Sequence, residues 1–170
     1  VYSLQKGDFS EASTGYINYY QDNRSKRAKI SDTAVVMYNN VYHGLYSRLS
    51  DYTIFEEADK IVLADNDGDN NIDIIKIEKY TYYLVKTVSK EKETINFDKN
   101  GGVLEIDDKS WVEFILNGSS AGLEDLKKSD VLTVLESVRK DGSKVFSGVV
   151  TRKIEEGKIS QIGSDELGEY

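Results

Sequence analysis

The acidic stretch at residues 65–73 constrains the fold more than any other part of the chain, because it separates two apolar runs. It reads Asp-Asn-Asp-Gly-Asp-Asn-Asn-Ile-Asp, and it lies between an apolar run at 61–64 and a long alternating run at 72–88. Asp, Asn and Gly tolerate the left-handed backbone conformation that tight turns require. Alternation of apolar and polar side chains is typical of a β-strand. The sequence therefore predicts two strands joined by a tight acidic turn.

The alternation within 72–88 is interrupted once. Ile74 and Ile75 are adjacent, so the period of two breaks between them. Such a break predicts a β-bulge or a bend in the strand.

The rest of the chain consists mainly of short runs rich in β-branched and aromatic residues, which favour strands. These runs lie at 16–20, 33–38, 94–97, 103–106, 111–116, 131–138, 144–154 and 157–162. Asn39-Asn40 and Asp141-Gly142 are typical of hairpin turns. Single helical turns are expected only near 45–49 and 123–128. We therefore expect an all-β fold, built from small barrel- or sandwich-like β units with very little helix.

Two parts of the chain resemble each other. Residues 35–40 are similar to 112–118, and residues 59–63 are similar to 130–134. Either one β unit is duplicated, as in tandem-repeat proteins, or the likeness reflects the strand–turn–strand pattern of all β proteins. The expected organisation is an N-terminal strand or linker segment at 1–28, a first β unit at 29–107 and a second β unit at 108–170.

Composition excludes several classes of function. The 170 residues include no cysteine and one histidine, so no disulfide, no thiolate site and no multi-histidine metal site can form. The net charge of −8 argues against nucleic acid or anionic lipid as a partner. No apolar run approaches the roughly 20 residues that span a bilayer. The chain starts at Val1, and we expect it to be a piece of a longer protein.

The acidic turn is the best candidate for a metal site. Asp65, Asp67, Asp69 and Asp73 match acidic positions of the EF-hand loop, and clustered oxygens suit calcium. A complete EF-hand is excluded, because Lys76 stands where a bidentate Glu is needed and the flanks are predicted strands. Two interpretations remain: a weaker calcium site in a β-loop, or a solvated turn whose Asp side chains cap backbone N–H groups.

Other polar and aromatic residues are further candidates for sites. His43 and the acids Glu56, Glu57 and Asp59 could carry catalysis, but such residues more often serve packing or solvation, so we expect no enzyme activity. Six of the twelve tyrosines could form an aromatic platform for sugar rings, or they could pack in the core. These six are Tyr16, Tyr19, Tyr20, Tyr80, Tyr82 and Tyr83.

Several short motifs resemble those of β-rich modules in cell-surface proteins of clostridia and related Firmicutes, which often accompany S-layer homology modules. The second half contains Leu116-Asn117-Gly118-Ser119-Ser120, a Leu-Glu-Asp-Leu-Lys-Lys-Ser-Asp-Val-Leu phrase at 123–132 and Gly-Lys-Ile-Ser-Gln-Ile at 157–162. The first half contains the acidic turn itself. The chain departs from the usual pattern at Ser129 and Asn70, where glycine is common in these proteins.

The resemblance covers roughly residues 33–162. It implies a non-catalytic structural or interaction module of a Gram-positive cell-surface or S-layer-type protein, secreted as part of a larger chain. The implied partners are a cell-wall polymer or other copies of a surface protein, and calcium would stiffen the acidic turn. The alternative is a carbohydrate- or cell-wall-binding module that uses surface tyrosines.

Overall fold

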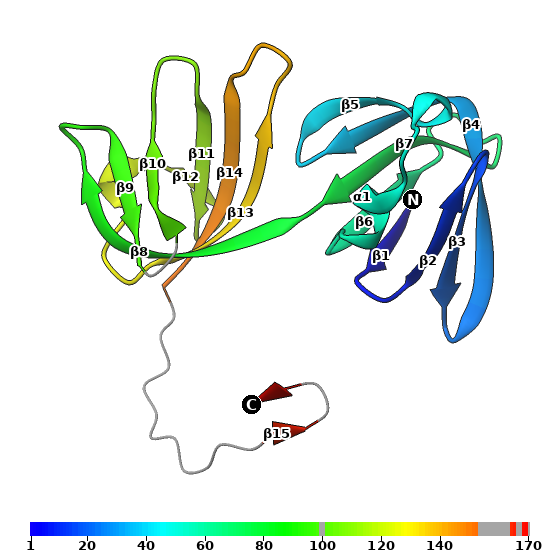
Figure 1. The fold of residues 1–170 in the computed structure, drawn as a ribbon, viewed down its shortest axis with the longest axis horizontal. Coiled ribbons are helices and arrows are strands. Elements are labelled where there is room, and N and C mark those ends of the chain that lie inside the picture. Colours follow the sequence, from blue (N-terminus) through cyan, green and yellow to red (C-terminus); the bar gives the residue numbers. More distant parts are fainter. Residues whose placement is uncertain (99–100, 153–163, 166–167, 170) are drawn as a thin grey trace.

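The computed structural model describes residues 1–98, 101–152, 164–165 and 168–169, and it confirms an all-β fold of two halves (Figure 1). Two seven-stranded sheets account for most of the described chain, and a two-stranded pair is formed by β15 (Ser164–Asp165) and β16 (Gly168–Glu169). The strand predicted at 157–162 and the end of the one predicted at 144–154 lie outside the described residues.

The first sheet has the order β1-β6-β7-β4-β3-β2, and β5 pairs with β4. Its strands are β1 (Tyr2–Gln5), β2 (Phe9–Ser13), β3 (Tyr16–Gln21), β4 (Arg24–Tyr38), β5 (Val41–Leu45), β6 (Lys60–Ala64) and β7 (Asn71–Glu78). A 3₁₀ turn, η1 (Tyr46–Arg48), and the short helix α1 (Thr53–Glu56) connect β5 to β6. The helical turn expected near 45–49 is thus present.

The second sheet has the order β10-β9-β8-β13-β14-β11-β12. Its strands are β8 (Tyr80–Ser89), β9 (Thr94–Phe97), β10 (Val103–Glu105), β11 (Trp111–Leu116), β12 (Ser119–Ala121), β13 (Val131–Val138) and β14 (Lys144–Thr151). A 3₁₀ turn, η3 (Leu123–Asp125), lies between β12 and β13, within the helical turn predicted at 123–128.

Five strands of each half pair in the same order and directions. In the first half β1–β6 and β6–β7 are antiparallel, β7–β4 is parallel and β4–β5 is an antiparallel hairpin. In the second half β8–β13, β13–β14, β14–β11 and β11–β12 repeat this series. The hairpin turns also correspond, because Asn39 and Asn117 both have positive φ, at 45° and 53°. This shared connectivity is what a duplicated β unit requires.

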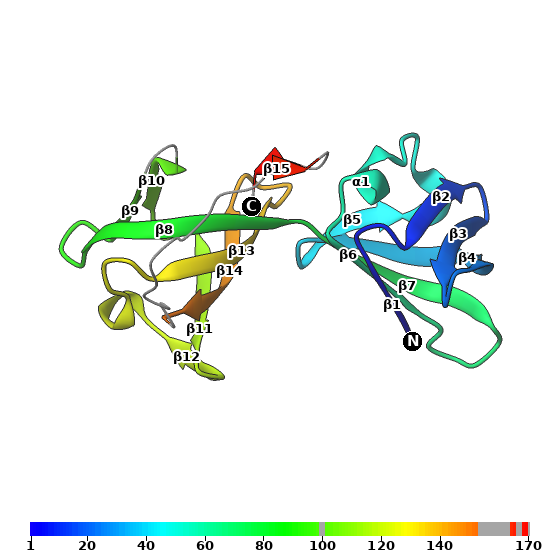
Figure 2. The same cartoon turned by 90° about the horizontal axis from the view of Figure 1, so that it is seen from below.

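The sheets divide at Lys79, the single residue between β7 and β8. The expected division at 107/108 therefore does not coincide with the division between sheets, and residues 1–28 form part of the first sheet. The predicted strand at 72–88 is two strands belonging to different halves (Figure 2). Periodicity could not reveal this, because both strands alternate and no turn former separates them.

Ile74 and Ile75, where an irregularity was predicted, pair in regular register with Val35 and Val36 of β4 and with Ala64 and Leu63 of β6. The irregularity lies between Ile72 and Ile74, and the extra residues belong to the partner strand β4. The register shifts there, because Ile72 faces Ile30 whereas Ile74 faces Val35. As a result Ile72 and Ile75 are both buried, although they are an odd number of residues apart, and Ile74 is 40% exposed.

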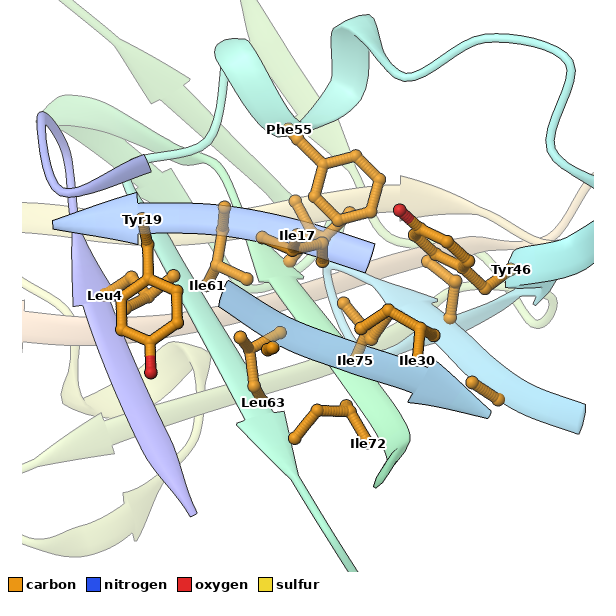
Figure 3. Close-up of a cluster of buried hydrophobic side chains, with 14 of the residues drawn as sticks. Leu4, Ile17, Tyr19, Ile30, Tyr46, Phe55, Ile61, Leu63, Ile72 and Ile75 are labelled. Atoms are coloured by element: carbon orange, nitrogen blue, oxygen red, sulfur yellow. The ribbon is translucent and has the colours of Figure 1, made fainter. Parts of the chain in front are cut away.

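Each half has its own hydrophobic core. In the first half, Tyr46 of η1 and Phe55 of α1 lie over the buried face of the sheet and pack edge to face, with ring centroids 6.0 Å apart (Figure 3). In the second half, Phe114 and Phe146 pack in the same manner at 6.0 Å. Two separate cores mean that the link between the halves depends on other contacts.

Candidate functional site

The acidic turn joins β6 to β7, and its carboxylates bind the backbone of the turn. Asp65 accepts hydrogen bonds from the amides of Gly68 and Asn70, at 2.6 and 3.0 Å. Asp73 accepts one from the amide of Asn66 at 2.8 Å. Gly68 and Asn70 have positive φ, at 84° and 67°, so residues tolerant of left-handed backbone stand where the turn needs them. The sequence identified this turn correctly because its determinants are local.

Three of the four predicted metal ligands come together. Carboxylate oxygens of Asp65, Asp67 and Asp73 lie within 4.8 Å of one another. Asp69 lies outside this cluster and caps Asn71 instead, accepting from its amide at 2.7 Å and from its side chain at 2.6 Å. Those two hydrogen bonds lower the pKa of Asp69.

The three carboxylates fit a hard cation in chemistry but supply only part of a calcium shell. Calcium takes six to eight oxygen ligands, so backbone carbonyls and water would have to complete the set. The flanking elements are strands, which agrees with the exclusion of an EF-hand. The arrangement thus fits a weak calcium site, and it equally serves to fold the turn.

A second polar arrangement lies at the junction of the halves and centres on Asn39, which is 2% exposed. Its side-chain oxygen accepts from the amide of Lys79 at 2.8 Å, and its side-chain nitrogen lies 3.2 Å from the Lys79 carbonyl oxygen. The same nitrogen donates to the carbonyl oxygen of Glu136 at 2.7 Å. The Ser137 hydroxyl donates to the Asn39 carbonyl oxygen at 2.9 Å. Asn39 therefore connects the linker residue and both halves.

Charged groups surround the same junction. Glu78 is buried, with Lys76 at 2.9 Å, Lys60 at 3.5 Å and the Tyr80 hydroxyl at 2.5 Å. Burial raises the pKa of Glu78, but the hydrogen bonds from Tyr80 and Lys76 outweigh it, so the pKa is lowered. Asp59 accepts from the amide of Tyr80 at 2.8 Å. These bonds fix the chain on both sides of Lys79.

The other predicted site residues lie on different elements and do not come together in one site. Tyr20 and Tyr82 are 49% and 67% exposed but belong to different sheets, whereas Tyr19 is buried. His43 is exposed, and its ring centroid lies 6.2 Å from that of Tyr38. Glu56 and Glu57 are exposed around the end of α1, and Asp59 belongs to the junction. The six tyrosines therefore do not form one platform.

Comparisons with protein-family models, with curated proteins and with solved structures found no match for this chain. Among the described residues, no helix has the length and apolar character needed to cross a membrane.

Proposed function

We propose that the chain is a non-catalytic structural module of a bacterial cell-surface protein, in which two β units form a rigid spacer. The observation that carries the structural role is the bonding of Asn39 to both Lys79 and Glu136. Units in one chain normally move relative to each other unless their interface holds them. A one-residue linker whose amide and carbonyl are both held by a buried side chain opposes such motion.

The cell-surface setting rests on the resemblance of the motifs at 116–120, 123–132 and the acidic turn to Firmicutes surface proteins. In that setting the module would be part of a larger exported chain, and its partners would be a cell-wall polymer or further copies of a surface protein. Calcium at Asp65, Asp67 and Asp73 would stiffen the turn between β6 and β7.

The spacer role is tested by ¹⁵N NMR relaxation of the full chain. A rigid spacer gives rotational diffusion that fits both halves as one body, with the long axis shared. If the amides of residues 2–78 and 80–151 require different diffusion tensors, the halves tumble separately and the spacer role is contradicted.

A carbohydrate- or cell-wall-binding role is the second candidate, and it is favoured by Tyr82, which is 67% exposed on β8. A large exposed aromatic side chain is a suitable surface for a sugar ring. A pull-down with purified cell-wall glycan tests this role. Retention that Tyr82→Ala abolishes would support it, and absence of retention would contradict it.

A further inference from the structure

The core side of the second sheet opens into a pocket of about 430 Å³. Its lining includes Tyr83 of β8, Phe97 of β9, and Glu136 and Phe146 of β13 and β14, with the exposed Lys144 at its rim. This volume lies in the range of small-molecule sites. The pocket could not be predicted from the sequence, because its residues come from five strands spread along the chain.

The pocket has an aromatic wall. The rings of Tyr83 and Phe97 are stacked with centroids 4.3 Å apart and an interplanar angle of 20°. The ring of Phe146 continues this arrangement, 6.0 Å from Tyr83 at an angle of 26°. The three near-parallel rings form an apolar stack, in which Phe97 and Phe146 are only 6% and 5% exposed.

Glu136 is an unusual residue in the lining, because it is acidic and lies on the core face of β13. It follows Leu132 and Val134 on the face of β13 that forms the core, both of which are fully buried, and it pairs directly with Phe146. Its Oε1 atom is buried and has no hydrogen-bond partner among the described residues. Burial, followed by the hydrogen bond to Glu136, raises the pKa of Tyr83 above its ordinary value, so its hydroxyl remains a donor to the carboxylate.

A carboxylate oxygen buried without a donor is unfavourable, and the group that relieves it must bring an O–H or N–H. The positive charge of Lys144 helps to distinguish an O–H donor from a protonated amine, because it opposes the entry of a second cation. A neutral O–H donor is therefore preferred to an amine. An aromatic wall adds a requirement for a ring with an apolar face.

We propose that this pocket binds a neutral sugar ring. Because Oε1 of Glu136 is buried, the Glu136 side chain rotates towards the pocket on binding, so that one sugar hydroxyl donates to Oε1 while the less polar face packs on the aromatic wall. Lys144 then donates to a sugar oxygen at the rim. The site differs from the exposed Tyr82, which lies on the opposite face of β8. It does not depend on the spacer role, whose test measures rotational diffusion without ligand.

The test is an NMR titration of the full ¹⁵N-labelled chain with glucose, galactose and N-acetylglucosamine at millimolar concentrations. At least one sugar should shift the amide signals of Tyr83, Phe97 and Phe146. Glu136→Met should weaken that sugar at least tenfold while retaining the fold, because methionine is similar in length and removes the unpaired acceptor. Glu113→Met is the matched control on β11, and Tyr82→Ala tests the opposite face; neither should change the affinity.

Several results would overturn the proposal. These are a lack of shifts with all three sugars, unchanged affinity in Glu136→Met, loss of affinity in Tyr82→Ala, or preferential binding of methylamine. If Glu136→Met does not fold, Lys144→Met provides the comparison, because Lys144 is exposed. A several-fold loss of sugar affinity in Lys144→Met is expected, and unchanged affinity there would contradict the site.

Discussion

The side-chain amide of Asn39 donates a 2.7 Å hydrogen bond to the carbonyl oxygen of Glu136, 97 residues further along the chain. Asn39 lies in the turn between β4 and β5, where its φ of 45° directs the chain back on itself. The same turn thus closes a hairpin of the first half and binds the second half. A turn residue of the first half thus makes polar contacts with the second half, although the two halves have separate hydrophobic cores.

Replacement of Asn39 by alanine should lower the free energy of unfolding by about 1–3 kcal/mol, because it leaves the partly buried amide of Lys79 and the carbonyl of Glu136 without their partner. Chemical denaturation measures this loss. Relaxation of ¹⁵N nuclei should also show the two halves acquiring independent motion.

Asn117→Ala is the matched control, because Asn117 occupies the corresponding turn with a φ of 53° but is exposed. Any cost of placing alanine in left-handed backbone is common to both variants. Equal destabilisation of the two variants, with no change in the motion of the halves, would contradict the role assigned to Asn39.

Calcium binding at the acidic turn should be weak, with a dissociation constant of about 10⁻⁴ to 10⁻³ M, because affinity depends on the number of charged ligands and three carboxylates supply only part of the shell. Isothermal titration calorimetry should detect heat that Asp67→Asn and Asp73→Asn remove. Asp69→Asn is the control, because Asp69 binds Asn71 outside the cluster of the other three carboxylates. Absence of heat in the unmodified chain would leave the carboxylates with a purely structural role.

The stability of the second half should depend on the ionisation of Asp130. Burial raises the pKa of Asp130, but hydrogen bonds from Arg152 and from the Lys127 amide outweigh it, so the pKa is lowered. The folded state therefore retains a charged Asp130 at pH values where the unfolded chain, with a pKa of about 3.9, takes up a proton. The stabilisation is present above that value and is lost as the pH falls through the lower, folded value.

Asp130→Asn should therefore destabilise the chain at pH 7 by about 1–3 kcal/mol, and the difference from the unmodified chain should shrink in acid. Denaturation curves at a series of pH values measure both effects. Asp108→Asn, on an exposed loop, should follow the unmodified chain at every pH. A deficit in Asp130→Asn that stays constant down to pH 2 would argue against the ionic contribution.

Gly148 allows β14 to pack closely in the second core. A methyl group there would lie 3.2 Å from Cγ2 of Val134 and 3.3 Å from Cδ1 of Phe114. Gly148→Ala should cost about 1–3 kcal/mol, because neighbouring side chains must shift in a packed core. Gly44→Ala on β5 is the control, since its added methyl would meet nothing within 4 Å. Chemical denaturation that shows equal stability for both variants would refute this packing argument.

The sequence predicted those features whose causes are local. The acidic turn and the Asn39-Asn40 hairpin follow from residues adjacent in the chain. The division at Lys79 could not be predicted, because it depends on which distant strand each side of Lys79 joins. Likewise, Asp69 fits the spacing of a metal loop, but its contact with Asn71 depends on the shape of the turn.

The pocket beside Glu136 illustrates the same limit. Glu136 comes after the apolar residues Leu132 and Val134 of an alternating run. A polar residue at position 136 therefore predicts that the buried face of the strand ends there. Only the register of β13 against β14 places it opposite Phe146. Side chains from five strands define the pocket, so no single segment contains its pattern.

The parallel pairing of β4 with β7, and of β11 with β14, affects how the protein forms. Each parallel pair consists of the first and the last of four strands that follow one another in the chain, β4 to β7 and β11 to β14. Each sheet is therefore completed only when its final strand is available. The first sheet ends at Glu78 and the second begins at Tyr80. During synthesis the first half can consequently fold to completion while the second half is still being made, and this order limits mispairing between two similar sets of strands.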